Sequence, residues 1–215
     1  MTEFKKIRKA LIPVAGLGTR LMPATKAIPK ELLPLLNKPL IQYIVEEAVS
    51  VGIKEIVLIT RSGKESIENH FDSDFEIESL LKNSGKKGIL KNFPKQAFKN
   101  ISFESVRQGE PLGLGHAILS AKHVLRKDEP FSVFLPDEYL FSLNQCTDFR
   151  KMIINYQQTG KGQILAEKIK NKDIPSYGII DIGGKKITQL NPKQIINFYE
   201  KPSIKSAPSN LRIIG

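Results

Sequence analysis

The alternation of buried strands and amphipathic helices constrains the fold of this chain more than any other feature. Residues 9–15 (KALIPVA) and 53–60 (IKEIVLIT) are short apolar runs typical of buried strands. Residues 39–51 between them have apolar side chains at helical spacing, and Pro39 suits the first helical turn. A strand, a helix and a second strand in this order predict a parallel βαβ unit.

The alternation continues through most of the 215 residues. Helices are predicted near 64–71, 75–83, 115–125 and 147–158, and strands at 101–107, 131–135 and 163–169. The runs YGIIDIG, KKITQLN and IINFYEKP in the tail are strand-like. We therefore expect an α/β fold: a Rossmann-like, mostly parallel sheet with helices on both faces, and an antiparallel strand extension after residue 170.

Charge and cysteine usage limit the partners and the compartment. The net charge of +11 favours anionic partners, and segment 82–99 carries six lysines and no acid. Nucleic-acid binding usually also needs interleaved aromatics, and only Phe93 and Phe98 lie there, so a solvated, lysine-rich excursion is the favoured interpretation. No apolar run approaches the roughly 20 residues of a membrane helix. The single cysteine, Cys146, fits a reducing cytoplasm. We predict no nucleic-acid or membrane partner.

A stretch of glycines, prolines and cations follows the first predicted strand: PVAGLGTRLMPATKAIPKELLP, residues 13–34. Glycines let backbone N–H groups approach a phosphate chain, and Arg20 and Lys30 supply cations on a proline-braced loop. The stretch is neither a Walker A motif nor a Rossmann fingerprint, since Leu21 stands where the third glycine would fall. It predicts a phosphate-binding loop; the alternative is a tight turn with surface charges.

The string G-L-G-T-R-L-x-P-A-T-K-x-x-P-K-E-L-L-P resembles the signature of sugar-1-phosphate nucleotidylyltransferases. Within that family the chain is most similar to the bacterial UTP–glucose-1-phosphate uridylyltransferases. The similarity continues through SIENHFDSDFEIE, VRQGEPLGLGHAIL, LPD, SYGIID, YEKP and APSNL. It covers essentially the whole chain and is weakest at 82–99.

Two further positions combine a physical reason with this resemblance. Gln108 ends a predicted strand, and its amide offers a donor and an acceptor to the imide edge of uracil or thymine. Asp137 follows an apolar strand, where α/β proteins bind ligands, and Mg²⁺ on a triphosphate needs only one or two carboxylates. Glu138 is either a second acid at this site or a loop residue that points away.

The resemblance implies a role for each matching residue. Arg20, Lys30 and Asp137 are the implied catalytic residues, with Asp137 as the Mg²⁺ ligand. The nucleotide-binding positions are Ala15, Gly16, Gly18, Gln108, Gly113 and Gly115. Gly178, Glu200 and Lys201 would bind the sugar phosphate. No role in metal binding or catalysis is predicted for His70, His116 or His123.

The expected reaction is uridylyl transfer from UTP to α-D-glucose 1-phosphate, which gives UDP-glucose and pyrophosphate. A thymidylyltransferase of the same superfamily and an inactive nucleotide-binding remnant are the alternatives. We expect a single domain, with nucleotide binding in about 1–140 and sugar binding in about 141–215. The terminal run RIIG reads as an interrupted strand, so a missing C-terminal part with a second metal-binding aspartate is also expected. The resemblance implies a homo-oligomer for the family, but leaves it open for a chain that lacks this part.

Overall fold

The computed structural model describes residues 4–91, 93–139, 147–185, 187 and 192–214. The chain divides into two compact units, one of Lys5–Gln145 and one of Met1–Phe4 with Cys146–Gly215. Over the described residues, no helix combines the length and the apolar character that crossing a bilayer requires.

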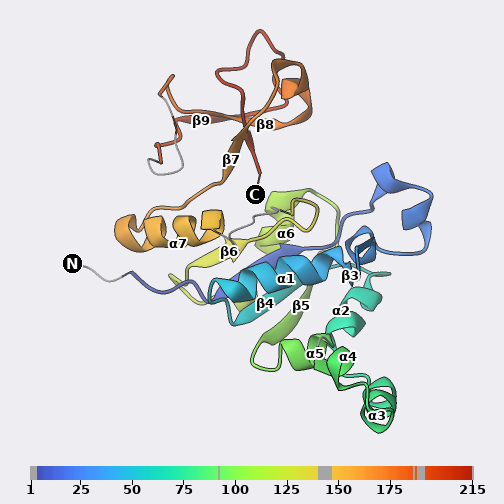
Figure 1. Ribbon diagram of the computed structural model, residues 1–215. Coiled ribbons are helices and arrows are strands. Elements are labelled where there is room, and N and C mark those ends of the chain that lie inside the picture. The colour runs from blue at the N-terminus through green and yellow to red at the C-terminus, as the bar shows by residue number, and fades with distance from the viewer. Residues whose placement is uncertain (1–3, 92, 140–146, 186, 188–191, 215) are drawn as a thin grey trace. The chain divides into compact units, whose positions relative to one another are not determined.

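A four-stranded parallel sheet forms the centre of the first unit (Figure 1). Its strands are β1 (Lys9–Pro13), β4 (Glu55–Thr60), β5 (Ser102–Arg107) and β6 (Phe131–Val133), in the order β5-β4-β1-β6. All three pairings are parallel. The predicted strands are confirmed with slightly shorter bounds.

Helices cover both faces of this sheet, as predicted. Helix α6 (Leu114–Ser120) packs Ala117 against Leu11 and Val57 on one face. Because side chains alternate along a strand, Ile12 points to the opposite face from Leu11. Helix α1 (Leu40–Ser50) lies over that face in Figure 1 and buries its own apolar stripe.

The strand order changes direction between β1 and β6. From β1, the chain first crosses to β4 and β5 on one side and then to β6 on the other. In α/β proteins, ligands bind beyond the carboxyl ends of the strands at such a point. The segments that follow β1 and β6 are the glycine stretch and Asp137.

The loop after β1 is the predicted proline-braced segment. It contains three turns of 3-10 helix, η1 (Thr19–Leu21), η2 (Ala24–Lys26) and η3 (Lys30–Leu32). A short antiparallel pair follows, β2 (Pro34–Leu35) with β3 (Lys38–Pro39). Pro39 is the N-cap of α1, so the helix begins at Leu40, one residue later than predicted.

The lysine-rich segment is more ordered than its composition predicted. After α2 (Glu65–Phe71) and α3 (Phe75–Asn83), the chain forms α4 (Lys87–Lys91) and α5 (Pro94–Ala97). Its lysines at 82, 86, 95 and 99 are exposed, as expected for a solvated excursion. Phe98, however, is buried, and its ring packs 6.0 Å from that of Phe71 and 6.1 Å from that of Phe103.

The predicted helix over 115–125 is wrong in its second half. Helix α6 ends at Ser120, and a separate 3-10 turn, η4 (Lys122–Val124), follows.

The second unit has its own antiparallel sheet. Helix α7 (Thr147–Thr159) precedes β7 (Ala166–Lys168), η5 (Asn171–Ser176), β8 (Gly178–Asp181), β9 (Asn197–Glu200) and β10 (Leu211–Ile213). The strand order is β7-β10-β8-β9. The antiparallel strands are confirmed, but they form a separate sheet instead of extending the parallel one. The predicted strand KKITQLN and Cys146 lie largely or wholly outside the described residues.

Candidate active site

The glycine turn after β1 is shaped by close packing. Gly18 has a φ of 69°, and a Cβ there would lie 3.2 Å from Thr25 Cβ and 3.3 Å from Lys30 Cβ. The Thr25 hydroxyl donates a hydrogen bond of 2.7 Å to the Gly18 carbonyl. A side chain at this position would be strained by its φ and would crowd its neighbours, so glycine is required.

Lys30 and Asp137 meet beyond the carboxyl ends of β1 and β6. Lys30 Nζ donates to Asp137 Oδ2 at 2.8 Å, and the two side chains are 19% and 56% exposed. Gly16 leaves room for the lysine, because a Cβ at Gly16 would lie 3.5 Å from Lys30 Cε. Two of the three predicted catalytic side chains are therefore in direct contact. The third, Arg20, is exposed in η1.

A buried ion pair that was not predicted involves Glu31, the residue that follows Lys30 in η3. Glu31 Oε2 accepts a hydrogen bond of 2.7 Å from Lys64 Nζ, and the two side chains are 0% and 5% exposed. Lys64 is the N-cap residue of α2, so the pair ties η3 to the start of that helix. Glu31 is the only acid between residues 4 and 45, a signal that could have marked it.

Gln108 is held firmly at the end of β5. Its backbone N–H donates to the Thr60 carbonyl at 2.8 Å, and the residue is 8% exposed. Its side-chain Nε2 lies 3.2 Å from the Gly113 carbonyl oxygen and 3.1 Å from His116 Nδ1. Gly113, with a φ of 95°, is the N-cap of α6.

The other glycine of this pair, Gly115, lies within the first turn of α6. Ala15, the remaining predicted nucleotide-binding residue, is buried directly after β1.

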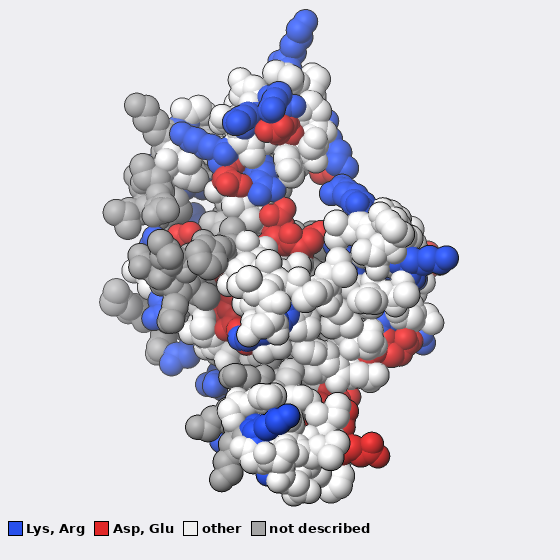
Figure 2. Space-filling view, turned by 45° about the vertical axis from the view of Figure 1, so that its right-hand side comes forward, with Lys and Arg blue, Asp and Glu red and all other residues white. Residues whose placement is uncertain are grey.

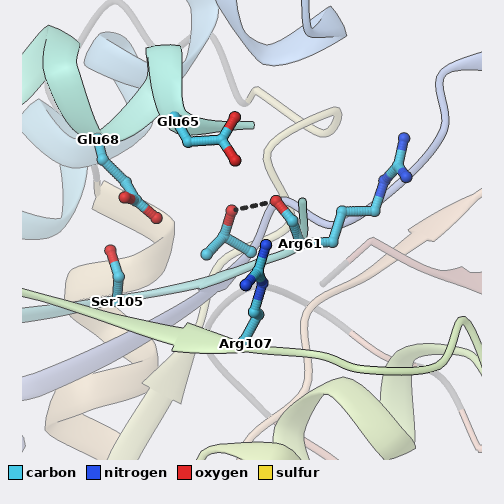
Figure 3. Close-up of a pocket in the computed structure, with 6 residues that line it drawn as sticks. Arg61, Glu65, Glu68, Ser105 and Arg107 are labelled. Carbon is cyan, nitrogen blue, oxygen red and sulfur yellow. Dashed lines mark hydrogen bonds between the residues drawn. The ribbon is translucent and has the colours of Figure 1, made fainter. Parts of the chain in front are cut away.

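A charged cavity lies next to this site (Figure 3). It has a volume of about 290 Å³ and is lined by Thr60, Arg61, Glu65, Glu68, Ser105 and Arg107. Hydrogen bonds from its own backbone N–H and from that of Gly63 lower the pKa of Glu65, and the charge of Arg107 adds to this. Arginines and glutamates occur here in equal number, so the cavity has no clear preference for anions.

The predicted sugar-phosphate residues come together in the second unit. Gly178 pairs with Glu200 across β8 and β9, and a Cβ at Gly178 would lie 3.5 Å from Glu200 Oε2. Lys201 Nζ lies 3.5 Å from Glu200 Oε1. The backbone N–H of Lys201 donates to the Tyr177 carbonyl at 3.2 Å. Both charged side chains are more than half exposed and therefore free to meet a ligand.

Positive charge does not gather into a continuous patch on the face shown in Figure 2, where Lys and Arg lie among Asp and Glu. Within the described ranges, no cluster of three or more His, Cys, Asp or Glu side chains could hold a metal ion. Asp137 alone suits an ion that arrives with a nucleotide, because such Mg²⁺ ions take most of their ligands from phosphate and water.

The parallel sheet, the glycine turn and the carboxylate at its strand ends define an α/β nucleotide-binding protein. Residues 9–215 match the Nucleotidyl transferase family, and the chain belongs to this family. Nucleotidyltransferases of this family generally use a divalent metal ion.

Similar proteins from bacteria indicate the branch of the family. A UTP–glucose-1-phosphate uridylyltransferase of Haemophilus influenzae is 47% identical over 210 residues, which cover 96% of this chain and 71% of that protein. The Escherichia coli enzyme of the same name is 46% identical over 214 residues. The aligned region covers 98% of this chain and 70% of the E. coli protein. The structure of a UTP-bound UGPase from Acinetobacter baumannii superposes with a TM-score of 0.90 and is 41% identical in sequence. The superposition covers 97% of this chain and 73% of the A. baumannii chain. The resemblance stated from the motifs is thus confirmed.

Proposed function

We propose that this chain transfers a uridylyl group from UTP to α-D-glucose 1-phosphate and releases pyrophosphate. The observation that carries the proposal is the contact between Lys30 and Asp137 beside the glycine turn. It brings a cation for phosphate and a carboxylate for a metal ion to one point beyond the carboxyl ends of β1 and β6. The uridylyltransferase relatives specify the substrates.

The reaction needs charge stabilisation more than acid–base catalysis. A phosphate monoester has a second pKa of about 6, so the attacking oxygen of glucose 1-phosphate is already ionised at neutral pH. This oxygen attacks the α-phosphorus of UTP, the bond to the β-phosphate oxygen breaks, and pyrophosphate leaves. The protein must hold two polyanions together and stabilise the charge of the transition state.

Each site residue has a role in this scheme. The backbone of Gly16 and Gly18 and the side chain of Arg20 hold the triphosphate, and Lys30 meets phosphate oxygens at the reacting centre. Asp137 would hold Mg²⁺, which would supply further positive charge to the site. In the second unit Glu200 accepts hydrogen bonds from sugar hydroxyls, and Lys201 meets the sugar phosphate.

The ion pair of Lys30 with Asp137 is well suited to opening when the substrate binds. A partly exposed pair contributes only about 0–1 kcal/mol to stability. Both groups can therefore change partners at little cost in free energy. Lys30 would then pair with a phosphate, and Asp137 would pair with the metal ion. A cytoplasmic location remains a prediction from cysteine usage.

An assay of pyrophosphate release tests the function and its alternatives. With UTP, glucose 1-phosphate and Mg²⁺ we expect turnover on the order of 1–10³ s⁻¹. A higher kcat/KM with dTTP than with UTP would favour the thymidylyltransferase instead. Binding of Mg²⁺–UTP without any pyrophosphate release would identify a non-catalytic nucleotide-binding protein. Absence of both binding and turnover would refute the proposal.

A further inference from the structure

Both side-chain hydrogens of Gln108 point to acceptors inside the protein. The amide Nε2 lies 3.2 Å from the Gly113 carbonyl oxygen and 3.1 Å from His116 Nδ1. A carbonyl oxygen can only accept, so the NH₂ group and not Oε1 must face it. The second hydrogen is then directed at His116, where Nδ1 must also accept.

This arrangement leaves the Gln108 side chain with one hydrogen-bonding atom that a ligand can use. With both hydrogens engaged, the amide offers only Oε1, which is an acceptor. The N3–H of uracil is a donor and complements it. The N3 atom of cytosine is an acceptor and would be repelled. From the sequence, we expected the amide to present both a donor and an acceptor to the base. In the structure, only the acceptor remains for the base.

We propose that His116 is a positioning residue that determines base specificity by fixing the Gln108 amide with Oε1 toward the ligand. The proposal rests on the proposed function, in which Gln108 contacts the base of UTP. Flipping the amide in the intact protein would break two hydrogen bonds and place Oε1 against two acceptors. Without the histidine acceptor, only the bond to Gly113 opposes the flip.

The proposal requires a specific tautomer of His116. Its Nδ1 carries a lone pair toward Gln108, so the proton of the neutral ring sits on Nε2. His116 lies within helix α6, and the printed sequence places it eight positions after Gln108.

Two substitutions distinguish the effect of the hydrogen-bond acceptor of His116 from the effect of its side-chain size. His116→Leu keeps a side chain of similar size and removes the acceptor. His116→Asn restores an acceptor, because its Oδ1 occupies a position similar to that of Nδ1. Calorimetry with UTP, CTP and 5-methyl-UTP in the presence of Mg²⁺ measures the outcome, and thermal melts report folding. The 5-methyl compound has the same imide edge as UTP and is the matched control ligand.

We expect the wild-type protein to prefer UTP over CTP, and His116→Leu to reduce this ratio by about tenfold, the effect of one lost hydrogen bond. His116→Asn should retain most of the ratio, and the ratio of UTP to 5-methyl-UTP should stay the same in all three proteins. An unchanged ratio of UTP to CTP in a folded His116→Leu protein would overturn the role of His116 alone. Equal binding of UTP and CTP by the wild-type protein would overturn the proposed function together with this inference.

A second measurement does not depend on the variants. In ¹⁵N-histidine spectra of the wild-type chain, which has three histidines, the Nδ1 of His116 should show the shift of an unprotonated ring nitrogen. A proton on Nδ1 in the neutral ring would overturn the proposal even if His116→Leu did not fold.

Discussion

Two adjacent residues, Lys30 and Glu31, have opposite surroundings at the scale of single side chains. Lys30 reaches a partly exposed carboxylate, Asp137, and its ion pair can exchange with solvent and ligand. Glu31 is fully buried, and its only ion-pair partner among the described residues is Lys64. One short turn therefore places a partly exposed cation beside a fully buried anion.

A third carboxylate, Glu47 on α1, is also buried, and burial raises its pKa to about 7 from the usual 4.5. Below pH 4.5 the folded and unfolded chains both hold this proton, and stability is unaffected. As the pH rises from 4.5 through 7, the unfolded chain releases the proton first, so the stability of the fold decreases.

We therefore predict that Glu47→Gln increases the free energy of unfolding at pH 8 by up to about 3 kcal/mol, since one pKa unit corresponds to about 1.4 kcal/mol. At pH 4.5 the gain should nearly vanish. Urea unfolding at the two pH values measures the difference, and Glu104→Gln, at an exposed position of β5, is the control. A gain that is the same at both pH values would contradict this account.

At the scale of elements, the Glu31–Lys64 pair joins the loop between β1 and β2 to the start of α2. The loop has only 3-10 turns and little buried apolar surface of its own. A hydrogen-bonded ion pair in a dry environment therefore fixes its position where packing is weak. Lys30 directly precedes Glu31 in η3, so the pair lies one residue from this cation.

We predict that Lys64→Met lowers the free energy of unfolding by about 3–5 kcal/mol, because it leaves the Glu31 charge buried without a partner. The double variant Glu31→Gln, Lys64→Met should recover part of the loss. The matched control is Lys82→Met, at an exposed position of α3, with an expected change within about 0.5 kcal/mol. Equal losses in the Lys64 and Lys82 variants would show that the ion pair has no special role.

At the scale of the whole molecule, the predicted site residues form two clusters in different compact units. Lys30, Asp137 and Gln108 belong to the first unit. Glu200 and Lys201 belong to the second, beside Gly178. If the first cluster binds the nucleotide and the second binds the sugar phosphate, substitutions in each cluster should affect the binding of only one substrate.

We predict that Lys30→Ala mainly reduces kcat and weakens Mg²⁺–UTP binding, whereas Lys201→Ala mainly raises the KM for glucose 1-phosphate. Neither should shift Tm by more than about 2 °C. Lys30 leaves behind a carboxylate that water can solvate, and alanine at Lys201 keeps the same backbone strain at a φ of 45°. Steady-state kinetics with thermal melts measure both effects. A large loss of Tm in both variants would assign the two lysines to the fold instead of the site.

Most elements of the fold could be predicted because their signals are local. The strand at Lys9–Pro13 and the helix at Leu40–Ser50 follow from side-chain periodicity within a few residues. The split after Ser120 was missed because the run 115–125 remains apolar across it. Helices α4 and α5 were missed because lysine-rich composition hides the packing of Phe98.

The sequence by itself determined the alternation of strands and helices, the glycine turn and the family signature. Each depends on residues close together in the chain. Only the tertiary structure decided which distant side chains meet: Lys30 with Asp137, 107 positions later, and Glu31 with Lys64. The orientation of Gln108 was also decided there, by a carbonyl and a ring nitrogen that helix α6 brings to it. These contacts depend on strand order, register and helix placement, which arise from packing the whole sheet and leave no signature in any short segment.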